Sequence, residues 1–196
     1  MIIFLDRQHA GKPHRPPDLG AGADIAGDGK REIWEQEAIW TAKYLLAAEL
    51  WLREKGYTVF PISDGRYSER HQRVNNYARS QLSIYVAAHI NAGGGNYGAV
   101  FFDHRSTKGH ILAAEIAVQL REDLPERGNR ARTVEASPTN WTKNAYHTIS
   151  GVSSWAICFE PCFIDCEAHR PLFSDEGMKR IGEALAKGIH NYIEEI

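Results

Sequence analysis

Short apolar segments constrain the fold of this sequence most strongly. Five runs are strand-like, several of them apolar throughout: residues 2–5, 57–62, 83–90, 99–103 and 155–160. A strand that is apolar on both faces is buried on both faces, as in parallel sheets covered by helices. Segments of helical periodicity alternate with these runs. The pattern predicts an α/β three-layer sandwich, with a mainly parallel or mixed sheet flanked by helices on both faces.

Four segments have the apolar spacing of helices: 33–55, 66–80, 109–123 and 175–194. Gly56 follows the first of them as a natural C-terminal cap. Residues 10–31 are rich in Gly, Pro and Asp and predict a long loop, and residues 125–150 are expected to be irregular. The length of 196 residues, without an internal repeat, fits a single domain over 1–196.

The composition excludes several classes of protein. A net charge of −2 gives no reason to expect nucleic acid or an acidic membrane surface as a partner. No apolar run is long enough to span a bilayer, and no signal peptide is recognisable, so we expect synthesis in the cytoplasm. The three cysteines, Cys158, Cys162 and Cys166, are odd in number and clustered. They predict buried thiols, Cys162 being the closest to a site, although their C-x3-C-x3-C spacing leaves a metal site open.

Side chains that can carry chemistry follow three of the predicted strands. His9 comes after the first strand, His89 lies at the end of the 83–90 run, and Glu160 ends the 155–160 run. Ligand sites in open α/β sheets lie at the carboxyl ends of the strands. A single histidine at a strand end is usually a loop or core residue. Three such residues at one edge of a sheet favour a shared site.

A catalytic zinc ion usually has three protein ligands from His and carboxylate groups, so a third ligand is needed. The helix over 33–55 offers Glu35 and Glu37 near its start. At about 100° per residue, Glu37 lies beside the apolar stripe of Thr41, Leu45, Ala48 and Leu52, and Glu35 lies on the opposite side. We therefore expect Glu37 to point towards the sheet and Glu35 towards water.

In its motifs the chain resembles the zinc-dependent N-acetylmuramoyl-L-alanine amidases of the amidase-3 family, nearly from end to end. The family's D-P-G-H-G-G turn corresponds to Asp6–Gly11, and its glutamate, 19 residues before a glycine, to Glu37. The S-I-H-x-N motif corresponds to residues 87–91, and E-x-G-F-I to residues 160–164. This resemblance implies zinc bound by His9, Glu37 and His89, with Glu160 as the general base.

Other residues are expected to support the site. Asp6 is a candidate to orient His9 or to form a turn, and Asn91 belongs to the second histidine motif. Arg73, at the family's arginine position, is expected to brace the site loops, and His147 is a candidate to line the substrate groove. Trp141 is a weaker groove candidate. The chain departs from the family at four positions where it has Gln8, Ala10, Ala87 and Cys162.

The resemblance implies hydrolysis of the amide bond between N-acetylmuramic acid and L-alanine of peptidoglycan. Without a recognisable cell-wall-binding module or signal peptide, the chain resembles a phage endolysin released through a holin, or a host amidase that acts when a mother cell lyses. We expect a monomer with peptidoglycan as its partner. Two alternatives remain: a zinc carboxypeptidase that acts on stem peptides, and a catalytically degenerate peptidoglycan-binding module.

Overall fold

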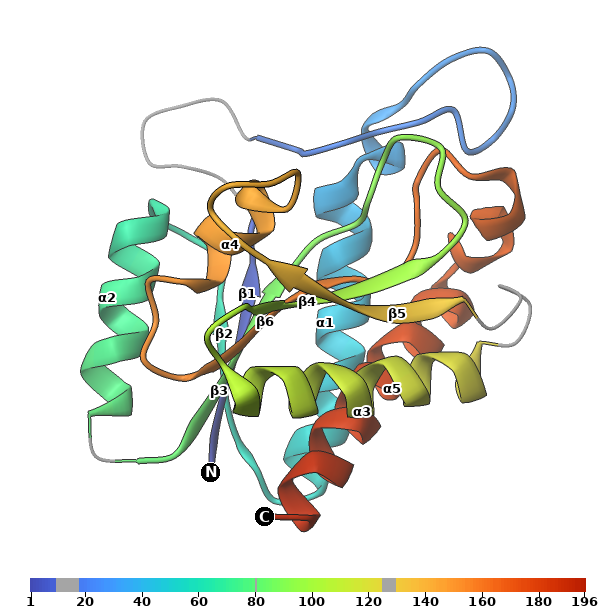
Figure 1. Ribbon diagram of the computed structural model, residues 1–196. Coiled ribbons are helices and arrows are strands. Elements are labelled where there is room, and N and C mark those ends of the chain that lie inside the picture. Colours follow the sequence, from blue (N-terminus) through green and yellow to red (C-terminus); the bar gives the residue numbers. More distant parts are fainter. Residues whose placement is uncertain (10–17, 80, 125–129) are drawn as a thin grey trace.

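The computed structural model describes residues 1–9, 18–79, 81–124 and 130–196, and its centre is a six-stranded sheet (Figure 1). The strands lie in the order β2-β1-β3-β6-β4-β5. Their bounds are β1 Ile2–Arg7, β2 Thr58–Ile62, β3 Ser83–Ala88, β4 Gly98–Asp103, β5 Ala131–Ala136 and β6 Trp155–Glu160. Strands β2, β1, β3 and β6 are parallel to one another, whereas β4 runs antiparallel to β6 and β5 is parallel to β4. The predicted α/β fold with a mixed sheet is confirmed.

Helices cover both faces of the sheet. One face packs against α1 (Glu37–Glu54), α3 (Thr107–Asp123) and α5 (Asp175–Glu194). The other face packs against α2 (Tyr67–Ala78) and the short α4 (Lys143–Ile149). Two 3-10 turns, η1 (Ile33–Glu35) and η3 (Glu167–Leu172), precede α1 and α5. No helix in the described part of the chain is long and apolar enough to cross a membrane.

The first strand shows why the apolar runs lack alternation. Ile3 and Leu5 point into the core beneath α1, α3 and α5, and Ile2 and Phe4 point into the core beneath α2 and α4. Successive side chains of a strand point to opposite faces, and both faces here are covered. The same reason accounts for the complete burial of β3 and β4.

The segment 125–150, predicted to be irregular, differs from expectation. Its described part contains β5 and α4. Strand β5 lies at the edge of the sheet, so polar residues such as Arg132 and Glu135 remain exposed, and the apolar signal of a strand is weak. Helix α4 has only seven residues, which is too short for helical periodicity to be recognised. In the predicted loop over 10–31, residues 10–17 lie outside the described residues.

Candidate metal centre and catalytic cavity

The strand order brings the three predicted strand-end residues to one edge of the sheet. Strand β3 lies between β1 and β6, parallel to both. The register pairs Arg7 with Ala88 and Ala88 with Phe159. The residues that follow these positions, His9, His89 and Glu160, therefore leave the sheet side by side. The shared site expected from the sequence rests on this topology.

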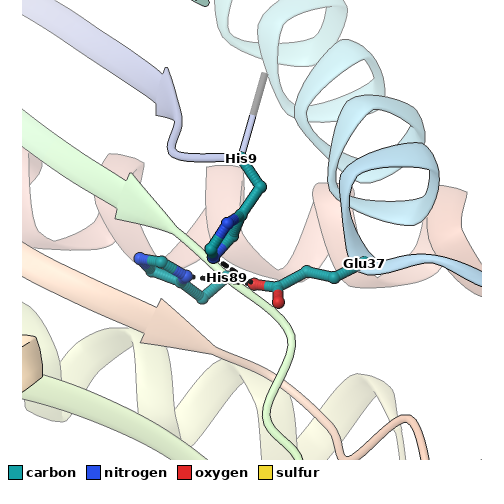
Figure 2. Close-up of side chains that lie close together, drawn as sticks. All are labelled: His9, Glu37 and His89. Carbon is teal, nitrogen blue, oxygen red and sulfur yellow. Dashed lines mark hydrogen bonds and ion pairs between the residues drawn. The ribbon is translucent and has the colours of Figure 1, made fainter. Parts of the chain in front are cut away.

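Two histidines and a carboxylate converge at this edge (Figure 2). Glu37 Oε1 lies 3.0 Å from His89 Nδ1 and 3.6 Å from His9 Nε2. One candidate ligand atom from each residue lies within 4.8 Å of the others. Within the described part of the chain, no other group of His, Cys, Asp and Glu side chains is arranged to hold a metal ion. This group includes no cysteine.

Glu37 is held firmly in place. It is the first residue of α1 and is buried, with both carboxylate oxygens accepting backbone hydrogen bonds. Ile90 N donates to Oε1 and Ala21 N donates to Oε2, each at 2.9 Å. Burial acts to raise the pKa of Glu37, but the hydrogen bond and charge of His89, together with the charge of His9, outweigh it and lower the pKa. The carboxylate is thus kept ionised, as a metal ligand must be.

The two histidines are positioned by different neighbours. The Tyr44 hydroxyl donates to the carbonyl oxygen of His89 at 2.8 Å, which ties the residue after β3 to α1. Burial alone would lower the pKa of His89, but the nearby carboxylates, chiefly Glu37, raise it. His89 Nε2 is buried and has no hydrogen-bond partner among the described residues. His9 Nδ1 lies 3.3 Å from Asp18 Oδ1, so Asp18 is the carboxylate beside the first histidine.

A cavity of about 560 Å³ opens beside the three residues. Its lining includes His9 and His89, Glu160 and Cys158 from β6, Tyr67 from α2, and Asn144, His147 and Thr148 from α4. The predicted groove residue His147 therefore does line the cavity. Trp141, which precedes α4, is exposed and lies edge-on to Phe101, with the ring centroids 6.0 Å apart.

Glu160 contributes its carboxyl group to the lining of this cavity. Burial raises the pKa of its carboxyl group to about 7, the charge of His89 opposes this rise and the charge of Glu37 adds to it. The side chain of Asn91 donates a hydrogen bond to Glu160, and the Cys158 thiol lies 3.9 Å from Glu160 Oε1. A carboxyl group with a pKa near neutrality can both accept and return a proton, which is what general acid–base chemistry requires.

The prediction that Glu35 points towards water is wrong. Glu35 belongs to η1, before α1 begins, and its side chain is fully buried. Its carboxylate accepts hydrogen bonds from Ala26 N at 2.8 Å and from Glu32 N at 2.7 Å. Burial acts to raise its pKa, but these backbone donors outweigh it and lower the pKa. The helical-wheel argument failed because the helix does not extend back to residue 35.

The predicted supporting residues Asp6 and Arg73 lie in other settings than expected. Asp6 is fully buried and accepts hydrogen bonds from Arg70, Tyr85 and Gln8, rather than lying against His9. Arg73 is half-exposed and pairs with Asp64 at 2.9 Å. The arginine that reaches the site is Arg70, one turn earlier in α2, whose Nη1 donates to Asp6 Oδ1 at 2.6 Å and to the carbonyl of Arg7 at 3.0 Å.

Gln8 explains how the chain accommodates its departure from the family's glycine. Its side chain is buried, and Nε2 donates to Asp6 Oδ2 at 2.6 Å and to the Tyr85 hydroxyl at 3.1 Å. These hydrogen bonds attach the turn that carries His9 to the buried side chains of Asp6 and Tyr85. Periodicity could not reveal these partners, because Asp6 lies on β1 and Tyr85 on β3. Ala10, the other neighbour of His9, lies outside the described residues.

The cysteines are free, and two of them are buried. Cys158 lines the cavity, whereas Cys162 packs in the core beneath α1 and α5, so the expectation that Cys162 lies closest to the site is wrong. Strand β6 ends at Glu160, and the alternation of side chains on which that expectation rested does not continue to residue 162. Cys166 is half-buried.

Several solved structures are similar to the structure of this chain. Cwp6 from Clostridium difficile has a similar structure, with a TM-score of 0.78 and 22% identity; the match covers 98% of this chain but only 29% of Cwp6. AmiC2 of Nostoc punctiforme, an N-acetylmuramoyl-L-alanine amidase, matches with a TM-score of 0.74 and 18% identity over 99% of this chain and 97% of its own. The catalytic domain of the CD27L endolysin targeting Clostridia Difficile matches with a TM-score of 0.68 and 18% identity over 97% of both chains.

At these identities the solved structures show the fold alone. The comparison with curated proteins gives no match. The family model described as N-acetylmuramoyl-L-alanine amidase matches residues 3–191, which is nearly the whole chain and includes His9, Glu37, His89 and Glu160. This protein belongs to the N-acetylmuramoyl-L-alanine amidase family.

Proposed function

We propose that this amidase cleaves the bond between N-acetylmuramic acid and L-alanine with one zinc ion bound by His9, Glu37 and His89, and with Glu160 as general base. The observation that carries the proposal is the convergence of the two imidazoles and one carboxylate beside the cavity that contains Glu160. Family membership supplies the reaction, and the geometry of these side chains supports the roles.

The donor atoms fit zinc. Two imidazoles and a carboxylate, with one position left for water, form a common ligand set of catalytic zinc. Ligands about 2.1 Å from a tetrahedral zinc lie roughly 3.4 Å from each other. The distances from Glu37 Oε1 to His89 Nδ1, 3.0 Å, and to His9 Nε2, 3.6 Å, lie on either side of this value. The orientation of both rings towards Glu37 supports the assignment (Figure 2).

Each residue of the site then has a defined task. When bound, zinc polarises the scissile carbonyl group and lowers the pKa of a coordinated water molecule. The Glu160 carboxylate accepts a proton from water and returns it to the nitrogen of L-alanine as the amide bond breaks. Asn91 donates to Glu160 and so fixes its orientation. His147, Asn144 and Tyr67 line the cavity and are positioned to contact the substrate.

The test combines metal analysis with digestion of purified peptidoglycan. We expect one equivalent of zinc in zinc-soaked protein, and free stem peptides that begin with L-alanine from an otherwise intact glycan. Glu160→Gln should keep the metal and the fold but lose at least a hundredfold in kcat, since it cannot accept the proton.

Four results would contradict parts of this assignment. Absence of a stoichiometric metal would refute the zinc site, and full activity of Glu160→Gln would refute the role of Glu160 as base. Shortened stems still attached to muramic acid would indicate a carboxypeptidase instead. Binding of peptidoglycan without any product would indicate a degenerate binding module.

For the cellular setting, we propose that the protein acts on the cell wall as an endolysin, after release from the cytoplasm through a holin. Similarity to the endolysin catalytic domain supports this setting, and similarity to AmiC2 supports a host amidase instead. Expression in a bacterial host with and without a holin tests whether release through a holin is required. Lysis that requires the holin is expected, and lysis without it would contradict the proposal.

A further inference from the structure

An exposed arginine lies on the face of the sheet that forms the catalytic cavity. Arg132, near the start of the edge strand β5, pairs in register with Ala99 of β4, and Ala99 pairs with Glu160 of β6. Residues opposite each other in a sheet point to the same face, so Arg132 and Glu160 share a face. Two strand spacings separate them, about 10 Å between Cα atoms.

The guanidinium group of Arg132 is held in a fixed position. It stacks on the ring of Tyr97, with Cζ 3.8 Å from the ring centroid. Tyr97 in turn packs edge-on against Phe163, at 4.9 Å between centroids, and Phe163 is buried. A stacked guanidinium keeps the hydrogen-bond donors along its edge free, and those donors match a carboxylate.

In the described part of the chain, Arg132 forms no ion pair and has no hydrogen-bond acceptor. Some other exposed arginines do have carboxylate partners: Arg53 pairs with Glu49, Arg73 with Asp64 and Arg105 with Asp103. Arg132 is thus an exposed positive charge stacked on Tyr97, on the same face of the sheet as Glu160 and two strands away from it. This combination is suited to binding an anion of the substrate.

We propose that Arg132, stacked on Tyr97, binds a carboxylate of the stem peptide, that of its second, D-glutamyl residue. This inference rests on the proposed function, because it takes the bond to L-alanine as the one held beside Glu160. An extended chain advances about 3.5 Å per residue, so the second residue lies roughly 7 Å beyond the scissile bond. The two strand spacings between Glu160 and Arg132 are of comparable length. Arg132 therefore distinguishes stems with a free carboxylate from stems in which it is amidated.

The experiment uses two muramoyl tripeptides that differ only in whether the α-carboxyl group of the D-glutamyl residue is free or amidated. For Arg132→Gln we expect KM to rise about tenfold on the free acid, as a charge-assisted hydrogen bond is lost. On the amidated substrate KM should not change, and kcat should be retained on both. Arg132→Lys should recover part of the loss, because it keeps the charge without the planar fork.

Lys179→Gln is the matched control. It removes one positive charge from the exposed surface of α5, on the opposite face of the sheet, and should leave both KM values unchanged. An equal effect of Arg132→Gln on both tripeptides, or none, would overturn the inference. If wild-type protein cleaves neither tripeptide, the proposed function fails. Calorimetric binding of the two tripeptides to wild type and Arg132→Gln then still decides the role of Arg132, since preference for the free acid must disappear in the variant.

Discussion

Replacing Arg70 with leucine should destabilise this protein far more than the same replacement of Arg73, three residues along the same helix. The side chains of Arg70 and Asp6 are 1% and 0% exposed, and their charged atoms lie 2.6 Å apart. Removing one partner of a buried pair leaves the other charge without compensation, which costs about 3–5 kcal/mol. Arg70 Nε also donates to the carbonyl of Gly65 at 2.9 Å, and this acceptor loses its partner as well.

Arg73 provides the matched control. Its side chain is 44% exposed and that of its partner, Asp64, is 73% exposed, so Arg73→Leu should cost less than about 1 kcal/mol. The free energy of unfolding is measured by urea denaturation with a shared m-value. For a chain of this size, a loss of 3–5 kcal/mol lowers Tm by about 6–20 °C.

The same variant also tests how the His9 turn is held. Because Arg70 bonds to the carbonyl of Arg7, two residues before His9, zinc affinity should fall in Arg70→Leu at temperatures where the variant remains folded. Equal destabilisation by Arg70→Leu and Arg73→Leu would refute the argument about the buried ion pair. Unchanged zinc affinity in a folded Arg70→Leu protein would refute the claim that Arg70 positions His9.

Two further predictions concern buried titratable groups. Glu37→Ala should abolish stoichiometric zinc binding in a folded protein. Glu35→Ala should retain zinc but lose about 1–3 kcal/mol of stability, since two backbone N–H groups lose their acceptor. Metal analysis and urea denaturation check both variants, and loss of zinc in a folded Glu35→Ala protein would contradict this prediction. Burial lowers the pKa of His71 from its usual 6.5, despite the opposing hydrogen bond to the Thr148 carbonyl at 2.9 Å. The unfolded chain then binds the proton more readily, so His71 contributes stability above about pH 6.5 that is lost as the pH falls through its folded-state pKa. His71→Gln should have a weaker decline in the free energy of unfolding below pH 6.5 than wild type, and an identical decline in both proteins would contradict this prediction.

The sequence by itself determined the fold class and indicated which side chains meet at one edge of the sheet. Apolar runs without alternation indicated strands covered on both faces, because burial on both sides removes any need for polar residues. His9, His89 and Glu160 could be grouped because each follows such a strand, and parallel strands end at one edge. Glu37 could be chosen because it continues the apolar stripe of α1, which the sheet buries.

Only the tertiary structure decided the contacts that depend on separate elements. Gln8, Arg70 and Tyr85 come from a turn, a helix and a strand, and they meet at Asp6 because β1, β3 and α2 pack together. Neither periodicity nor spacing encodes such a meeting, and the family's arginine position points to Arg73 rather than to Arg70. Because α1 begins only at Glu37, Glu35 lies in the preceding turn η1, and its carboxylate caps that turn.

The position of Arg132 depends on topology in the same way. It shares a face of the sheet with Glu160 because β5 lies beside β4, and β4 beside β6 in the opposite direction. Local sequence determines which residues form an element and which of its faces is apolar. The order and direction of the strands determine which side chains from distant segments share a site, since that depends on the packing of the whole chain.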